Sequence, residues 1–343
     1  MTAKNILLIC GTLNQTKAML AIGGELAEHN CYYTPFYCEG HLLRASQRGQ
    51  LDFTVLAGRL RERSLQYMYD RSVSIDDRGE GREYDLVVTC TDLILQSNIK
   101  DKRIVLVQEG LTEPEGFLYW LVKHVGLPRV FANTAAFGLS DAYEVFCVAS
   151  EGARELFQSK GVSNNKMVTT GIPGFDHVDA YRTNDFRHTN FVLVCTSNAR
   201  ETFKYDDRLR FLRSALHIAA GRPVIFKLHP TENVKRATRE IRRFAPDAPV
   251  YSSGNVNHMI ANASVVITQQ STCTFVAVAL GKEVHTNLDT NELKRLMPIQ
   301  NGGVSAKRIA CLCQHLLRMP MPLLQQARKG YRARAQWERM DLS

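Results

Sequence analysis

The chain has 343 residues, of which 45% are hydrophobic and 22% charged, and this composition is typical of a soluble globular protein. The length favours two domains, and no stretch reaches the roughly 20 apolar residues that a membrane-spanning helix needs. The formal charge of +9 favours an anionic partner. The absence of zinc-finger, helix-turn-helix and aromatic RNA-binding signatures argues against nucleic acid.

The first apolar run, "NILLIC" at 5–10, is too short for a signal peptide and has no cleavage site behind it. We therefore interpret it as a strand and expect a cytoplasmic protein. The nine cysteines are scattered and form no CxxC pair. This usage favours a reducing compartment, without a zinc site or a disulfide framework.

Short apolar runs then alternate with longer amphipathic stretches, which is typical of βαβ units. Helical patterns lie between the runs, for example at 17–29, 150–161 and 208–221. Hydrophobicity within the runs is continuous rather than alternating, which indicates parallel sheets covered on both faces. The predicted strands are 5–10, 84–90, 103–108, 143–150 and 166–171 in the first half, and 190–197, 223–229, 249–253, 264–269 and 283–288 in the second.

The segment 171–190 is rich in Gly, Pro, Asp and Asn and interrupts this rhythm, so we expect a hinge there. The predicted fold class is α/β, with two doubly wound Rossmann-like domains and a cleft between them, the GT-B architecture. We expect an acceptor-side domain at 1–175 and a nucleotide-binding domain at 188–321. A basic C-terminal helix at 322–343 is expected to pack back onto the first domain.

Ligands of open α/β sheets bind beyond the carboxyl ends of the strands, so the residues there are the candidates for the site. In the first half, Gly11 and Thr12 follow the first strand, where helix N–H groups suit an anion or Thr12 simply caps the helix. Asp92 follows the next strand. Glu109 and Glu113 follow "IVLVQ", and we select Glu109 as a general base for a sugar hydroxyl, with Glu113 either in the cleft or a solvated loop charge.

In the second half, three strand ends carry polar residues that fit a nucleotide phosphate. Ser and Thr at a helix start satisfy its N–H groups or present them to a diphosphate. A single His is more often structural than catalytic, but a His-Pro and a Ser-Thr at ends of the same sheet open onto one crevice. The predicted phosphate-side residues are Ser197, Asn198, Lys227, His229, Pro230, Thr231, Gln270, Ser271 and Thr272.

The order of these motifs resembles that of the hydrolysing UDP-GlcNAc 2-epimerases. "KNILLICGTLNQTKAMLAIGGEL", "LVQEGLT" and "ASEGARELFQSKGVSNNKMVTTGIPGFDHV" resemble their "FGTRPEAIK", "HVEAGLR" and "TEGARENLLREGV" stretches, and "KLHPTENV", "ASVVITQQSTCTF" and "ALGKEV" follow in order. The 171–176 turn with Gly171 and Pro173, the His-Pro and the Ser-Thr are also similar to CDP-glycerol glycerophosphotransferases. The order acidic-Gly, His-Pro, Ser-Ser/Thr is similar to bacterial sialyl- and polysialyltransferases.

Departures from the epimerase pattern decide between these relatives. Leu13 stands where the epimerases have Arg, Ser271-Thr272-Cys273 replaces their "SGG", and Asp92 is a shifted counterpart of their acidic residue. The matching residues that remain, Glu109, His229, Ser271 and Thr272, are shared with transferases. The resemblance therefore implies a GT-B enzyme in which Glu109 faces the acceptor, and His229 with Ser271 and Thr272 holds the nucleotide phosphate.

We accordingly predict a metal-independent glycosyltransferase that moves a sugar from a nucleotide-activated donor to an acceptor hydroxyl in bacterial surface polysaccharide, glycolipid or related glycan assembly. The donor is UDP- or CMP-linked and is a substrate, so no cofactor is expected. Whether His229 also moves a proton stays open. The alternatives are a UDP-GlcNAc 2-epimerase-like enzyme and a non-catalytic nucleotide-sugar sensor. The basic segments 58–64 and 328–339 are either solvated helix faces or contacts with an anionic membrane or acceptor, with peripheral attachment at the inner face.

Overall fold

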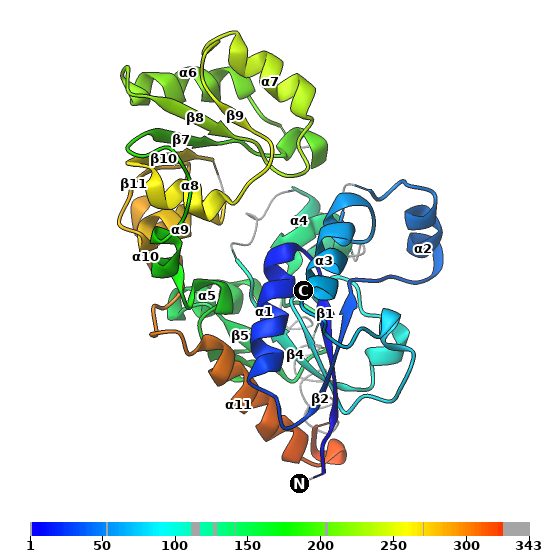
Figure 1. The fold of residues 1–343 in the computed structure, drawn as a ribbon. Coiled ribbons are helices and arrows are strands. Elements are labelled where there is room, and N and C mark those ends of the chain that lie inside the picture. Colours follow the sequence, from blue (N-terminus) through cyan, green and yellow to red (C-terminus); the bar gives the residue numbers. More distant parts are fainter. Residues whose placement is uncertain are drawn as a thin grey trace. The chain divides into compact units, whose positions relative to one another are not determined.

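The computed structural model describes residues 2–52, 54–110, 117–125, 129–140, 142–202, 205–269 and 271–324 (Figure 1). The chain divides into two compact units. Unit 1 comprises Met1–Asp176 and the chain from Pro298 onward, and unit 2 comprises His177–Met297. The boundary between Asp176 and His177 lies within the hinge predicted at 171–190.

Unit 1 is built on a six-stranded sheet in the order β2-β1-β3-β4-β5-β6, with every pair parallel. The buried strands carry almost only apolar side chains, as expected when both faces of a sheet are covered. Parallel pairing brings the carboxyl ends of all six strands to one edge. The strands are β1 (Asn5–Cys10), β2 (Asn30–Pro35), β3 (Leu86–Thr89), β4 (Arg103–Val107), β5 (Val145–Val148) and β6 (Met167–Thr169).

Helices cover both faces of this sheet. On one face α1 (Leu13–Gly24), α3 (Gly58–Asp70) and α11 (Ser305–Arg318) pack on alternate residues of β1, β3 and β4 (Figure 1). On the other face Phe146 of β5 packs edge-on against Phe157 of α5 (Glu151–Lys160) and against Phe137. The remaining elements are α2 (Gly40–Gln47), α4 (Phe117–Val125), η1 (Asp77–Gly79), η2 (Ser97–Ile99), η3 (Arg129–Ala136), η4 (Asn164–Lys166) and η5 (Pro173–Phe175).

Helix α11 corrects the predicted domain boundary. The second domain was expected to run to residue 321, but unit 2 ends at Met297 and α11 belongs to unit 1. The reason is its apolar stripe, which includes Ile309 and Cys313 and is buried in the same core cluster as β1 and α1. At its end, the Arg103 Nη2 donates to the Met319 carbonyl at 2.8 Å. After a break at 319–320 the chain is helical again over 321–324, and the rest of the predicted helix 322–343 lies outside the described residues.

Unit 2 contains a five-stranded parallel sheet in the order β11-β10-β7-β8-β9. Helices α6 (Arg208–Ala219) and α7 (Val234–Arg242) pack together on one face, over Val194 and Phe226. Helix α8 (Val256–Asn262) contacts α9 (Cys273–Ala279). The strands are β7 (Val192–Cys195), β8 (Val224–Lys227), β9 (Val250–Tyr251), β10 (Val265–Thr268) and β11 (Glu283–His285), and the other elements are η6 (Val178–Arg182), η7 (Ala199–Thr202) and α10 (Thr290–Leu296).

The predicted fold class is confirmed, since both units are parallel sheets with interleaved helices and all ten predicted strands are present. Strand β2 was missed. It is an edge strand that begins on an exposed Asn30 and ends on Pro35, so it lacks the apolar run of the central strands. In the part of the chain that is described, no helix is both long and apolar enough to cross a membrane.

Candidate functional site

The predicted site residues fall at the carboxyl edges of the two sheets, as the strand pattern indicated. Each unit holds its own set. Glu113 and Gln270 lie outside the described residues. Unit 1 contains Gly11, Thr12, Asp92, Glu109, Gly171 and Pro173, and unit 2 contains Ser197, Asn198, Lys227, His229, Pro230, Thr231, Ser271 and Thr272.

The turn between β1 and α1 is a capping box that reaches Glu109. The Thr12 hydroxyl accepts from the Gln15 N–H at 3.3 Å, and the Gln15 side-chain oxygen accepts from the Thr12 N–H at 2.8 Å. The Gln15 Nε2 then donates to the Glu109 Oε2 at 3.1 Å. A Cβ on Gly11 would lie 1.8 Å from the Gln15 Oε1, so only glycine lets Gln15 fold back in this way.

Glu109 follows β4 and carries a carboxylate suited to proton transfer. Burial raises the pKa of this carboxyl above its ordinary value, while hydrogen bonds from Gln15, Thr12 and Asn14 oppose the rise. A carboxylate whose pKa moves toward neutrality is a better general base at physiological pH. Gln15 was not among the predicted site residues, although the Thr-x-x-Gln spacing of a capping box marks it in the sequence.

The Asp92 side chain stabilises the loop that contains Gly138 and Ser140. The side chain is buried, and its two oxygens accept from the Gly138 and Ser140 N–H groups, each at 2.9 Å. The Arg129 Nη1 lies 3.7 Å from the same carboxylate. These contacts give Asp92 a structural role, and its predicted contact with an acceptor stays a prediction.

The turn after β6 contacts the start of α11, where the chain belongs to unit 1 again. Gly171 has φ +86°, and a Cβ there would lie 2.4 Å from the Ser305 Oγ. Pro173 begins η5, and Asp176 just beyond it accepts from the Ser305 and Ala306 N–H groups at 3.1 and 3.2 Å. This turn therefore caps α11, and the predicted acceptor contacts of Gly171 and Pro173 stay predictions.

In unit 2, hydrogen bonds select one tautomer of His229. The Thr231 N–H donates to the His229 Nδ1 at 3.3 Å, and the Thr231 Oγ1 lies 2.9 Å from the same nitrogen. The Asn198 Nδ2 donates to that hydroxyl at 3.1 Å, which directs the hydroxyl proton toward the ring. Because Nδ1 accepts, the proton of the neutral ring is on Nε2.

His229 is neutral at physiological pH. Burial, with a further contribution from the Lys227 charge, lowers its pKa from 6.5 to about 4. Lys227 is itself buried, and its Nζ donates to the Leu228 carbonyl at 2.9 Å. The site therefore presents a neutral Nε2–H donor, and Pro230 beside it is exposed.

This lowered pKa predicts a loss of stability in acid. In the unfolded chain His229 takes up a proton near its ordinary pKa of 6.5, but in the folded protein only near pH 4. The unfolded state therefore binds more protons between these values, so we expect His229 to cost the fold about 2 kcal/mol between pH 7 and pH 5. Urea unfolding of the wild type and His229→Gln at both pH values measures this. If the wild type and His229→Gln lose the same unfolding free energy between pH 7 and pH 5, the lowered pKa of His229 is contradicted.

A buried ionic network lies beneath the His229 loop and was not predicted as part of the site. The Glu232 carboxylate accepts from the Thr196 hydroxyl and from the His229 N–H at 3.3 Å, and the Arg208 Nη1 lies 2.7 Å from it. Arg208 also pairs with Asp206 at 3.0 Å. The Arg208 side chain is 3% exposed, and both carboxylates are 0% exposed. The network thus joins the end of β7, the start of α6 and the His229 loop.

The remaining phosphate-side residues follow β7 and β10. Ser197 and Asn198 follow β7, and the Ser197 carbonyl accepts from the Arg208 Nη2 at 2.9 Å. The Ser271 hydroxyl accepts from the Cys273 N–H at 3.3 Å at the start of α9. Thr272 is partly exposed, and no hydrogen bond from its side chain caps the helix in the described structure.

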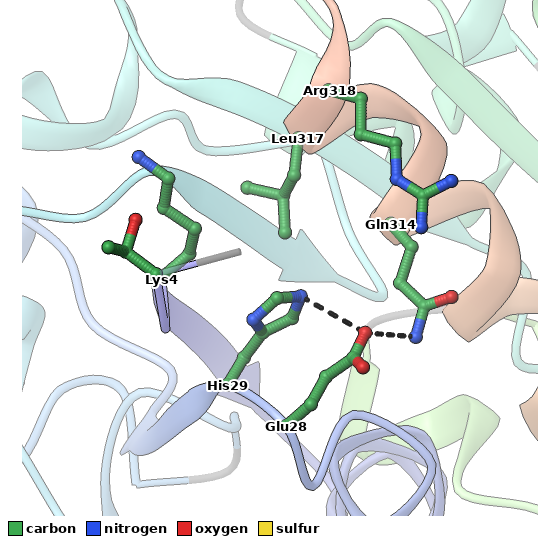
Figure 2. A pocket seen from close by; sticks show the side chains of 7 residues that line it. Lys4, Glu28, His29, Gln314, Leu317 and Arg318 are labelled. Atoms are coloured by element: carbon green, nitrogen blue, oxygen red, sulfur yellow. Dashed lines mark hydrogen bonds and ion pairs between the residues drawn. The ribbon is translucent and has the colours of Figure 1, made fainter.

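Two hollows lined by described residues contain neither Glu109 nor His229. One, with a volume of about 190 Å³, lies at the amino end of β1, opposite the edge that carries Glu109 (Figure 2). There the Glu28 carboxylate accepts from the Gln314 Nε2 at 2.8 Å and lies 3.6 Å from the His29 Nε2. The other hollow, of about 580 Å³, lies after β9, the strand that pairs with β8. Its lining includes Phe186, Tyr251, Ser253, Asn255 and His258.

Among the described residues, no group of three or more His, Cys, Asp or Glu side chains could hold a metal ion. The predicted absence of a metal from the reaction stays a prediction.

Comparisons with known proteins find the fold but no relative in sequence. No protein-family model matches the chain, and no curated protein matches it in sequence. UDP-GlcNAc 2-epimerase from Neisseria meningitidis bound to UDP-GlcNAc is a similar solved structure, with a TM-score of 0.54 and 11% identity over 91% of this chain and 100% of that one. The Methanocaldococcus jannaschii UDP-GlcNAc 2-epimerase in complex with UDP-GlcNAc and UDP has a TM-score of 0.56 and 14% identity over 91% of this chain and 99% of that one.

A third similar structure is the wall teichoic acid polymerase TagF with CDPG, with a TM-score of 0.55 and 11% identity over 93% of this chain and 90% of that one. The strand order of both sheets and these likenesses define the fold class: the protein has the GT-B fold. Several of its structural neighbours are UDP-GlcNAc 2-epimerases, and one is a wall teichoic acid polymerase. The predicted cleft between the two domains stays a prediction.

Proposed function

We propose that this protein is a glycosyltransferase that uses a nucleotide-activated sugar. The observation that carries the proposal is His229, whose tautomer is selected by Thr231 and Asn198 and whose loop is anchored by the buried Glu232–Arg208 pair. Such a site holds an N–H donor in place before any ligand arrives. Preorganised donors of this kind stabilise negative charge as it develops on a leaving phosphate.

Unit 2 binds the donor in this proposal. The His229 Nε2–H donates to a phosphate oxygen, and the partly exposed Ser271 and Thr272 add hydroxyl groups after β10, which β7 separates from β8 in the sheet. The hollow after β9, with the rings of Phe186 and Tyr251 and the amide of Asn255, suits a nucleotide base. A UDP- or CMP-linked sugar is the proposed donor, as a substrate and without a metal cofactor.

Unit 1 supplies the base. Glu109, with its raised pKa, takes the proton from an acceptor hydroxyl while that oxygen attacks the sugar. His229 enters the reaction as a neutral hydrogen-bond donor, because its lowered pKa leaves little imidazolium near pH 7 to act as an acid. A glycan or glycolipid hydroxyl is the proposed acceptor.

The test is a thermal-shift screen with UDP-, CMP-, CDP- and GDP-linked sugars, followed by a product assay with the donor that binds. A ligand that binds only the folded state stabilises it by about 2.7 kcal/mol at 100 times its Kd. We expect a melting-temperature rise with one nucleotide class, and acceptor-dependent release of nucleotide. No shift with any of the four classes would contradict the proposal.

A 2-epimerase-like reaction on a UDP-sugar is the second candidate, supported by the similarity of the fold to several UDP-GlcNAc 2-epimerases. Its signature is release of UDP and of an altered free sugar without any acceptor. Turnover of that kind would replace the transferase proposal. Binding without turnover, with or without acceptors, would instead favour a nucleotide-sugar sensor.

A further inference from the structure

The outer sides of α6 and α7 form one cationic surface on unit 2 (Figure 1). The two helices lie side by side over β7 and β8 and share a core cluster that contains Leu212 of α6 and Ile241 of α7. Arg213 of α6 reaches Phe244, just after α7, with its guanidinium carbon 5.4 Å from the centre of the ring. The exposed cations of this surface, named here the α6–α7 face, are Arg210, Arg213, Lys235, Arg239, Arg242 and Arg243.

Carboxylates do not offset the charge of the α6–α7 face. Every residue of the two helices is described, and Glu240 is the only acidic residue within them. Both Glu240 oxygens accept from Arg200, each at 2.8 Å. Among the described residues, the ion pairs of this region involve Arg200, Arg208 and Arg236 and none of the six cations of the face. The face therefore carries a concentrated positive charge that is free to attract an anionic partner.

The α6–α7 face also exposes large apolar side chains. Leu209 in the first turn of α6 is 39% exposed, and Val234 in the first turn of α7 is 41% exposed. Each directly precedes a cation of the face, Arg210 or Lys235. The six cations line neither of the two hollows, whereas a small anion is usually bound in a concave site. Helical surfaces that combine cations with exposed apolar side chains are typical of proteins that lie on a bilayer.

We propose that the α6–α7 face docks unit 2 onto an anionic lipid bilayer, with Leu209 and Val234 in the interface. Lys and Arg head groups bind lipid phosphates while their aliphatic stems cover apolar surface, so the whole face is used. A polyanionic chain such as a nucleic acid uses the charges but leaves the two apolar side chains in water. The sequence suggested membrane contact at the basic segments 58–64 and 328–339, whereas this face lies elsewhere in the chain.

Sedimentation with lipid vesicles tests the docking on the full chain. The vesicles are phosphatidylcholine with and without roughly 30% phosphatidylglycerol. We expect the wild type to sediment only with the anionic vesicles at about 0.1 M salt, and to be released as the salt is raised, because exposed charges are then screened. Neither Glu109 nor His229 takes part, so the outcome is independent of the proposed function.

Two double variants separate this face from charge in general. Each Lys or Arg close to an anionic bilayer strengthens binding by a factor of roughly five, so Arg239→Gln with Arg242→Gln should weaken vesicle binding by a factor of about 25. Both side chains are exposed, and glutamine suits a helix, so the fold is kept. Lys294→Gln with Arg295→Gln is the matched control on α10 of the same unit, after the edge strand β11, and should bind like the wild type.

A third double variant tests the apolar part of the face. Leu209→Ser with Val234→Ser keeps every charge and removes the side chains that enter the interface. We expect it to weaken vesicle binding at least threefold, because that apolar surface no longer leaves water. Circular dichroism and thermal melting of each variant confirm that it is folded before its binding is compared.

Three results would overturn the docking: no sedimentation of the wild type with anionic vesicles, equal losses in the α7 and α10 variants, or unchanged binding in the apolar variant. The first uses the wild-type chain and so does not depend on the folding of any variant. Retention of the wild type on heparin without vesicle binding would assign the face to a polyanionic chain and would also overturn the proposal. If no nucleotide binds the protein, the proposed function fails while sedimentation still decides the docking.

Discussion

Glu109→Gln is expected to lower the rate of sugar transfer by a factor of about 10² to 10⁴ while leaving donor affinity unchanged, as removal of a general base does. The substitution keeps the shape of the side chain and removes only its capacity to take a proton. Glu109 belongs to unit 1, whereas the proposed phosphate contacts belong to unit 2, so kcat and not donor binding should change. Steady-state kinetics with the preferred donor, together with calorimetric titration of that donor, measure both quantities.

Glu28→Gln is the control, since it makes the same change on an exposed carboxylate of the same unit, 61% accessible, at the opposite edge of the sheet. The raised pKa of Glu109 also predicts that wild-type kcat rises with pH through a value above that of an ordinary glutamate. If Glu109→Gln transfers sugar at the wild-type rate, the carboxylate is not the base.

The second large effect concerns stability. Arg208→Met should lower the free energy of unfolding by about 3–5 kcal/mol at pH 7, because it leaves the buried carboxylates of Asp206 and Glu232 without their nearest cation. Methionine keeps most of the volume of the arginine stem, so the lost charge dominates. The destabilisation should lessen as the pH falls toward 5, because burial raises the pKa of Glu232 and protonation of that carboxyl removes negative charge that Arg208 no longer offsets. Urea unfolding at the two pH values measures both effects.

Arg295→Met is the matched control. Arg295 pairs with Glu292 one turn away at 2.9 Å, and both side chains are 37% exposed, so the same substitution there should cost less than about 1 kcal/mol. Equal losses in the two variants would show that the buried network does not anchor the His229 loop. Wild-type affinity for the nucleotide in Arg208→Met would lead to the same conclusion.

Much of the fold could be predicted because central parallel strands are buried on both faces and so appear as apolar runs. Strand β2 could not be predicted in this way, since an edge strand tolerates polar residues and Pro35. Helix α1 was expected at 17–29 but spans Leu13–Gly24, because the Thr12 capping box sets its start. The assignment of α11 to unit 1 depends on packing between residues far apart in the chain, which no local pattern contains.

The residues of the candidate site that follow the strands could be predicted from the sequence, but the buried ionic network beneath the His229 loop could not. His229, Ser271 and Glu109 follow apolar runs, so their position at a sheet edge follows from the pattern alone. Arg208 begins α6 and Asp206 lies just before it. Both look like ordinary solvated charges in the sequence, yet both side chains are buried.

The most direct test of the central claim, that the His229 edge of unit 2 holds a nucleotide phosphate, is the affinity of His229→Gln for the nucleotide that stabilises the wild type. A hydrogen bond to a charged group contributes about 1.5–3 kcal/mol, so we predict that calorimetry at pH 7 will show roughly 10- to 100-fold weaker binding. His217→Gln, which alters an exposed imidazole on α6, should bind like the wild type. Unchanged affinity in His229→Gln would contradict the account.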